Sequence, residues 1–198
     1  MARARNGGQG NVGNRLRHEF AHAAHVHRDD IQRMAELNCV ADFSPFLWFP
    51  SDNLIKGKIP LVGKERSENA FRMKTMQMQG VEMIAGTDWP AMTPSVNLWH
   101  GIEAMVTRRN PYVDYPGTLS LHEALTLDEA LTIFTINGAR AQGIEADAGS
   151  LEVGKFADLI VLDRNPFTIE ATEISKIEVL MTMLEGETIC QREGWQGA

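Results

Sequence analysis

Cysteine is scarce in this chain. Only Cys39 and Cys190 occur among its 198 residues, and they lie far apart in the sequence. Two isolated cysteines exclude a disulfide-rich scaffold and a metal site built from paired cysteines. A reducing compartment is therefore the default, and we expect a cytoplasmic protein.

Long apolar runs are also missing. No segment approaches the roughly 18 uninterrupted apolar residues that a membrane-spanning helix needs. The first residues, Met1-Ala-Arg-Ala-Arg, do not form the apolar core of a secretory signal. Residues 1–14 are rich in Gly, Asn and Arg, which predicts a flexible tail ahead of a soluble protein that does not enter a membrane.

An excess of positive charge is missing too. The formal net charge is −7, and nucleic-acid binding needs a clustered positive surface to contact phosphates. Nucleic acid is therefore excluded as the main partner, and a small soluble substrate fits better. Hydrophobic residues make up 43% of the chain, which is enough to bury a core.

The most informative feature that is present is a strand ending on an acid. Residues 81–90 read Val-Glu-Met-Ile-Ala-Gly-Thr-Asp-Trp-Pro, a short apolar run bounded by Gly86 and Pro90. This pattern predicts a buried strand with Asp88 just past its carboxyl end. Enzymes built on parallel sheets hold catalytic side chains there. The alternative is that Asp88 only caps a helix after the strand.

The segments around this strand alternate between helix and strand, which predicts an α/β fold with a parallel sheet. Apolar spacing predicts a helix over 28–38, a strand over 39–45, a long loop through Gly63, and a second helix over 64–79 that Gly80 closes. After the strand we expect a helix over 97–109, a loop over 112–122, and a helix that starts at the capping box Thr126–Glu129 and runs toward Gly138.

The last part of the chain has a different character. Residues 151–163, 177–184 and 187–190 read as strands, and Glu185-Gly186 predicts a tight turn between the last two. The sequence therefore predicts a small β module behind the α/β region.

Four of the six histidines lie within residues 17–27, and this segment admits two interpretations. As a helix, His18-Glu-Phe-Ala-His22 matches the H-E-x-x-H pattern of zinc metalloproteases, with two histidines on one face and Glu19 as base. As a strand, it places His22 near a carboxyl end that faces the same side of the sheet as Asp88. In that case His22 is either a metal ligand or a purely structural histidine.

Several segments, in this order, together resemble the amidohydrolase superfamily, and the branch that includes N-substituted formamide deformylases is the closest in pattern. The resemblance extends from about Arg15 to the end of the chain. It rests on residues 17–31, 63–66, 86–90, 99–109, 135–139 and 149–163.

The resemblance implies a metal-dependent hydrolase of carbon–nitrogen bonds, with a (β/α)8 barrel and an added β-sandwich. His22 matches the metal-binding histidine that closes the sixth barrel strand. Asp88 matches the aspartate that follows the eighth strand, binds the metal and takes a proton from the attacking water. The implied metal is a divalent ion, most simply zinc. Trp89 and the loop over 48–63 would line the pocket mouth.

Two departures from the family pattern qualify this resemblance. Ala21 stands where the branch commonly has an acid. The histidine pair of the first barrel strand, the bridging lysine and the fifth-strand histidine have no counterpart here. The resemblance therefore implies that residues 15–148 are the C-terminal part of a barrel, about its last three strand–helix units, and that residues 149–198 are the β-sandwich module.

We accordingly expect a C-terminal fragment of an amidohydrolase that is inactive without its N-terminal half and acts, when complete, on a small amide-type substrate. A complementing N-terminal chain or a second copy is the expected partner. The alternative from another class is a non-catalytic interaction module: an incomplete barrel exposes strand edges and apolar surface, which must pair with another chain.

Overall fold

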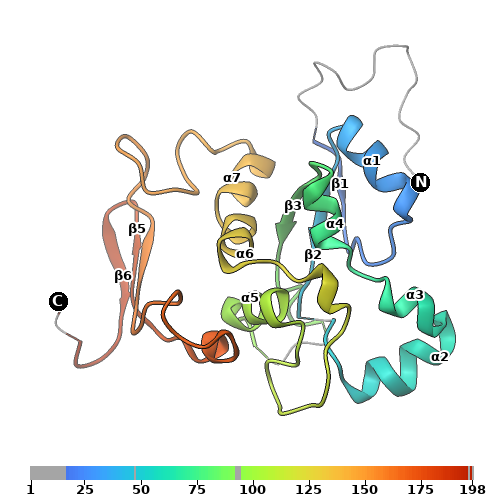
Figure 1. The fold of residues 1–198 in the computed structure, drawn as a ribbon. Coiled ribbons are helices and arrows are strands. Elements are labelled where there is room, and N and C mark those ends of the chain that lie inside the picture. Colours follow the sequence, from blue (N-terminus) through green and yellow to red (C-terminus); the bar gives the residue numbers. More distant parts are fainter. Residues whose placement is uncertain (1–16, 47, 92–94, 196, 198) are drawn as a thin grey trace.

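The computed structural model describes residues 17–46, 48–91, 95–195 and 197. The residues expected to form a flexible tail, 1–14, lie outside these ranges. The predicted parallel sheet is present: strands β1 (Glu19–Phe20), β2 (Val40–Phe43) and β3 (Glu82–Ala85) lie side by side in that order, and both pairings are parallel. The three carboxyl ends therefore meet at one edge of the sheet (Figure 1).

Helix α1 (Arg28–Glu36) connects β1 to β2, as the apolar spacing predicts. The side chain of His27 caps its first turn by accepting a hydrogen bond from the Asp29 N–H, and Asp29 and Asp30 lie where the helix dipole favours acids. Ile31 and Met34 are buried on the inner face. Local sequence signals are sufficient to place this helix.

The connection from β2 to β3 differs from the prediction. The expected loop through Gly63 contains a π-helical turn, η1 (Asn53–Lys58), and helix α2 (Ile59–Val62), with a proline in the first turn of α2, where its missing N–H costs nothing. The single helix predicted over 64–79 is two helices, α3 (Lys64–Glu68) and α4 (Met73–Met78). Phe71 breaks it, because its φ is +55° and its N–H donates to the Ala24 carbonyl 2.8 Å away.

Within the described ranges, four helical segments lie between β3 and the next strand of the chain. Helix α5 (Leu98–Thr107) begins at Asn97, whose side chain accepts from the Trp99 N–H, and the 3-10 helix η2 (Leu121–Glu123) ends the following loop. The predicted capping box of Thr126 and Glu129 opens helix α6 (Leu127–Phe134). The expected continuation toward Gly138 is a separate helix, α7 (Ile136–Gln142), since Thr135 leaves helical geometry with φ −124° and ψ −97°.

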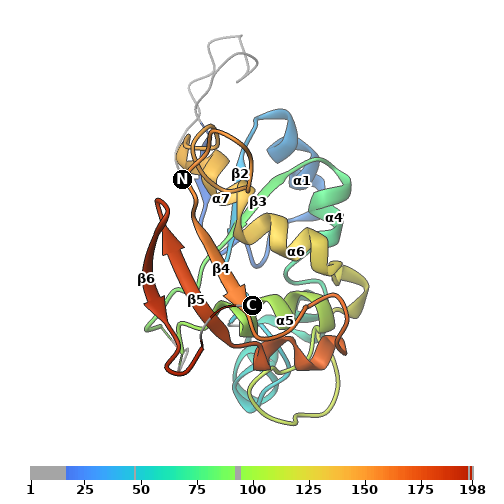
Figure 2. The same cartoon turned by 90° about the vertical axis from the view of Figure 1, so that its left-hand side faces the viewer.

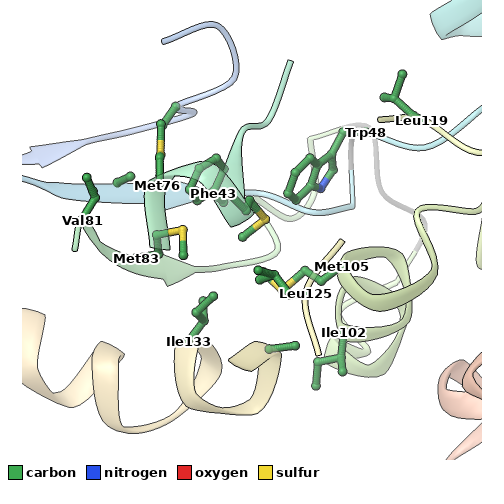
Figure 3. Packing of buried hydrophobic residues seen from close by; sticks show 14 of the residues in the cluster. Phe43, Trp48, Met76, Val81, Met83, Ile102, Met105, Leu119, Leu125 and Ile133 are labelled. Atoms are coloured by element: carbon green, nitrogen blue, oxygen red, sulfur yellow. The ribbon is translucent and has the colours of Figure 1, made fainter. Parts of the chain in front are cut away.

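The core fills the space between the parallel sheet and its helices (Figure 3). Ala41, Phe43 and Met83 point to the same face of the sheet and are buried. Side chains from α4, α5 and α6 pack against that face; they include Met73, Met76, Ile102, Met105, Ala130 and Ile133. This packing holds β2 and β3 rigidly and thereby fixes where their carboxyl ends lie.

The predicted β module is a three-stranded antiparallel sheet of β4 (Leu159–Leu162), β5 (Val179–Leu184) and β6 (Glu187–Gln191), seen in Figure 2. The turn at Glu185-Gly186 is confirmed, with φ +50° and +84°. The strand expected from residue 151 is shorter and begins at Leu159, because Gly154 turns the chain with φ +98°. The 3-10 helix η3 (Ala171–Lys176) joins β4 to β5.

Within the described ranges, no helix is long and apolar enough to cross a membrane. Cys39 is buried, Cys190 is exposed, and both are free thiols.

Candidate active site at the carboxyl ends of the parallel strands

The structure brings His22 and Asp88 together. His22 follows β1 and Asp88 follows β3, so two residues 66 positions apart lie at the same edge of the sheet. The His22 Nε2 and Asp88 Oδ2 atoms are 3.7 Å apart. Both side chains remain accessible, with 55% and 37% of their surface exposed. The arrangement is a histidine and a carboxylate that can act on the same small ligand.

Both residues have an unusual backbone. The φ angles of His22 and Asp88 are +53° and +54°, in the left-handed region that non-glycine residues rarely adopt. Flanking hydrogen bonds hold these conformations: the Ala23 N–H donates to the Asp42 carbonyl, and the Ala91 N–H donates to the Asp88 carbonyl. Strained backbone that the surrounding structure over-determines is typical of functional sites.

Strand β2 lies between these two residues and contributes two polar side chains that the sequence patterns did not single out. The Ser44 Oγ atom, one residue past β2, lies 3.5 Å from His22 Nδ1. Asp42 is half-buried, and burial together with the nearby Glu19 carboxylate raises its pKa, while His22 acts in the opposite direction. Asp88 adds to the increase, which indicates that Asp42 faces the same site.

The metalloprotease interpretation of residues 18–22 is wrong. Glu19 and Phe20 form β1 and pair with Val40 and Ala41, and the His18 carbonyl accepts the Val40 N–H at 2.9 Å. An H-E-x-x-H site needs both histidines on one helical face, and an extended backbone cannot provide that.

The surroundings of the site match the expected pocket mouth only in part. Trp89 is 57% exposed next to Asp88. Trp48, at the start of the expected mouth loop, is instead a core residue that stacks on Phe43 at 5.6 Å with Arg108 over its ring at 4.5 Å. Burial lowers the pKa of His25, three residues after His22, and the charges of Arg66 and Lys58 lower this pKa further.

A metal at this position would have two ligands from the described part of the chain. Nowhere in that part do three His, Cys, Asp or Glu side chains gather closely enough to hold an ion. The donor types of His22 and Asp88, imidazole nitrogen and carboxylate oxygen, are those that zinc binds in hydrolases. The two residues therefore fit two of the three protein ligand positions that a catalytic zinc centre usually has.

Two curated proteins are similar to this chain over most of its length. N-substituted formamide deformylase from Arthrobacter pascens is 31% identical over 191 residues, which are 94% of this chain and 33% of that protein. 5-Methylthioadenosine/S-adenosylhomocysteine deaminase from Thermoanaerobacter pseudethanolicus is 29% identical over 143 residues, 72% of this chain and 28% of that protein. The chain thus spans about a third of the length of the curated relatives it matches.

Solved structures and family profiles agree with these relatives. An uncharacterized metal-dependent hydrolase from Pyrococcus furiosus has a TM-score of 0.58 and 30% identity, over 76% of this chain and 29% of the other. The sequence profile of the Amidohydrolase family matches residues 1–190. This match covers nearly the whole chain, including both His22 and Asp88, and the chain therefore belongs to the amidohydrolase family.

Proposed function

We propose that this chain is the C-terminal part of a metal-dependent amidohydrolase that acts on carbon–nitrogen bonds other than peptide bonds. His22 is a metal ligand, and Asp88 is a metal ligand and the general base. The observation that carries the proposal is the 3.7 Å approach of His22 Nε2 to Asp88 Oδ2 across β2. The names of the relatives, a formamide deformylase and a deaminase, support the choice of bond.

The same proposal assigns the regions of the chain. Residues 15–148 form about the last three strand–helix units of a (β/α)8 barrel, with β1, β2 and β3 as its final strands. Residues 149–198 form the β-sandwich module, in which β4, β5 and β6 are three of the strands. The parallel order of β1, β2 and β3 and the antiparallel order of β4, β5 and β6 support this division.

The two ligands can share one ion. Zinc–nitrogen and zinc–oxygen bonds are about 2.0–2.2 Å long, so two donor atoms 3.7 Å apart can both reach the same metal. When bound, a divalent ion supplies Lewis acidity, which makes water a better nucleophile near neutral pH. In this proposal zinc is the metal and the substrate is a small amide-type molecule.

Asp88 moves the proton of the reaction. Its carboxylate projects from a fixed left-handed turn just past β3, and more than a third of its surface is open to a water or a substrate. It accepts a proton from the attacking water and passes it to the nitrogen that leaves when the carbon–nitrogen bond breaks.

The test is zinc binding and hydrolysis by the purified chain. With two ligands of its own, we expect the isolated chain to bind zinc weakly and to be inactive toward a formamide, and we expect His22→Ala and Asp88→Asn to abolish the remaining zinc binding. If this chain alone binds zinc tightly at one ion per chain and hydrolyses the formamide, the proposal that part of the metal site lies outside this chain is wrong. Zinc binding that survives both substitutions would overturn the ligand assignment.

A second candidate function is a non-catalytic interaction module, and the surface of the antiparallel sheet favours it. Every residue of β6 is exposed, and Ile160, Leu184 and Ile189 show 48–59% of their surface to solvent. Edge strands with apolar side chains tend to pair with another chain. In this proposal the partner is a second copy or a complementing N-terminal chain. Size-exclusion chromatography with light scattering tests the first possibility, and a clean monomer counts against it.

A further inference from the structure

Ser44 has a place in the site that neither the family pattern nor the sequence assigns. It follows β2 directly, between the strands that provide His22 and Asp88. The two nitrogens of the His22 ring have different neighbours: Nε2 faces Asp88 Oδ2 at 3.7 Å, and Nδ1 faces Ser44 Oγ at 3.5 Å. The ring is therefore held between a carboxylate and a hydroxyl.

We infer that Ser44 is a positioning residue that holds the His22 ring with Nε2 toward Asp88. The inference rests on the proposed function, in which Nε2 is the metal-binding nitrogen. A histidine that binds metal usually has its other ring nitrogen fixed by a hydrogen bond, and that bond sets the tautomer and the orientation of the ring. Ser44 is the side chain that provides this bond.

A hydroxyl suits this role because it both donates and accepts hydrogen bonds. In the free chain, a neutral His22 with its proton on Nε2 faces Asp88, and Nδ1 accepts from the Ser44 hydroxyl. With a metal on Nε2, the proton is on Nδ1 and donates to the Ser44 oxygen. The same contact thus holds the ring in both states, whereas an ionised carboxylate in this position, which only accepts hydrogen bonds, would favour one of them.

The backbone beneath Ser44 is rigid enough for the task. The Asp42 carbonyl accepts from the Ala23 N–H at 3.1 Å, and the Phe43 carbonyl accepts from the Gly86 N–H at 3.0 Å, so β2 is tied to the segments that carry His22 and Asp88. Phe43 is fully buried and stacks on Trp48 at 5.6 Å with the ring planes 8° apart (Figure 3). These contacts fix the point from which the Ser44 side chain projects.

The first measurement needs no metal. Long-range ¹H–¹⁵N spectra of the full chain report the ring nitrogens of His22, and His22→Ala assigns the signals. We expect Ser44→Ala to shift the Nδ1 signal, Ser44→Thr to restore it because threonine keeps the hydroxyl, and Ser150→Ala, a serine beside Lys155 and Glu152, to leave it unchanged. Identical His22 signals in the chain and in Ser44→Ala would overturn the inference, whatever the result with metal.

The second measurement is calorimetric titration of the same five proteins, the parent chain and its four variants, with Zn²⁺. Loss of a hydrogen bond to a ligand histidine typically weakens metal binding about 10–100-fold, and we expect the low end for Ser44→Ala because His22 is half exposed. Ser44→Thr should bind nearly as the parent chain does. Equal affinity of Ser44→Ala and the parent chain overturns the positioning role. If no variant loses zinc binding, His22→Ala included, the proposed metal ligands are wrong. The spectra alone then decide whether Ser44 positions the His22 ring.

Discussion

The parallel sheet and the antiparallel sheet of this chain differ in how deeply their strands are buried. Three of the four residues of β2 are buried, whereas all five residues of β6 are exposed, although each strand alternates apolar and polar side chains in part. The parallel strands are covered on one face by α4, α5 and α6, whereas the antiparallel strands lie to one side of these helices in Figure 1. Burial therefore separates the two regions.

This difference explains where the candidate site lies. A catalytic pair needs a fixed backbone, and the core under β2 and β3 provides it, with Phe43 and Met83 buried beneath the strands that lead to Ser44 and Asp88. The antiparallel sheet is less buried, and all five residues of β6 are exposed.

The largest expected effect comes from the core of the parallel region. Trp48 is 1% exposed, stacks on Phe43 and lies under the Arg108 guanidinium. Trp48→Ala should lower the free energy of unfolding by about 3–5 kcal/mol, since it removes a large buried side chain and leaves a cavity. Urea denaturation followed by circular dichroism measures this loss.

The matched variant in the other region is Ile189→Ala in β6. Because Ile189 is 59% exposed, its loss should change the free energy of unfolding by no more than about 0.5 kcal/mol. A loss of stability as large as that of Trp48→Ala would show that β6 is covered in solution, by a second copy or another chain. The difference in burial between the two sheets would then not hold in solution.

The segment that joins the two regions gives the next effect. Gly149 has φ +89°, and a Cβ added there would lie 2.6 Å from the Ala139 Cβ and 3.0 Å from the Ile136 Cα, both in α7. Gly149→Ala therefore combines backbone strain with a clash and should cost about 2–4 kcal/mol in the free energy of unfolding. Thermal and urea unfolding both report it.

Gly154→Ala is the control for this position. Gly154 also has a positive φ, +98°, but no atom lies within 4 Å of an added Cβ. Gly154→Ala should therefore lower the free energy of unfolding only through backbone strain, by about 1–2 kcal/mol. Equal losses at Gly149 and Gly154 would mean that the chain is not packed against α7 in solution and that the two regions are independent.

Within the parallel region, the capping box of α6 should give a smaller effect. The Thr126 hydroxyl accepts the Glu129 N–H, and the Glu129 carboxylate accepts the Thr126 N–H. Thr126→Ala leaves a helix N–H without its partner and should cost about 1 kcal/mol. Thr132→Ala, at an exposed position of the same helix, should be close to neutral in the same urea titration. If Thr132→Ala lowered the free energy of unfolding more than Thr126→Ala, the capping box would not be what stabilises the start of α6.

The elements that the sequence predicts correctly share one property: their signals are local. The capping box of α6, the acids that open α1 and the Gly186 turn each involve residues within one helical turn or one hairpin. The apolar run that forms β3 is similarly short and ends at Gly86, so the position of Asp88 past a strand follows from a few neighbours.

The features that the sequence does not predict depend on contacts between distant segments. Phe71 interrupts the expected helix because its N–H bonds to Ala24 and its ring packs at 4.2 Å from Trp48, neither of which a helical pattern records. Ser44 reaches His22 only because β1 and β2 pair in register. Roles for His22 and Asp88 come from the family resemblance, whereas their proximity comes from the parallel order of three strands.

The smallest effect is a dependence on pH at the junction of the two regions. Glu103 in α5 is 4% exposed, and its Oε2 atom accepts the Ser175 N–H of η3 at 2.8 Å. Burial raises the pKa of this carboxyl above its ordinary value, although the bond from Ser175 acts in the opposite direction. The folded chain therefore keeps this proton to a higher pH than the unfolded chain does.

The sign of the effect follows from proton binding. Between the two pKa values the folded state binds more protons than the unfolded state, so this group makes the free energy of unfolding fall as pH rises through that window and contributes fully below it. Glu103→Gln keeps an oxygen that can accept from Ser175 but cannot ionise. We expect this variant to gain stability relative to the parent chain in urea titrations as the pH rises above about 4.3, the ordinary pKa of a glutamate. If the difference between Glu103→Gln and the parent chain stays constant as the pH rises, Glu103 is solvated in solution, and the contact between α5 and η3 does not hold the two regions together.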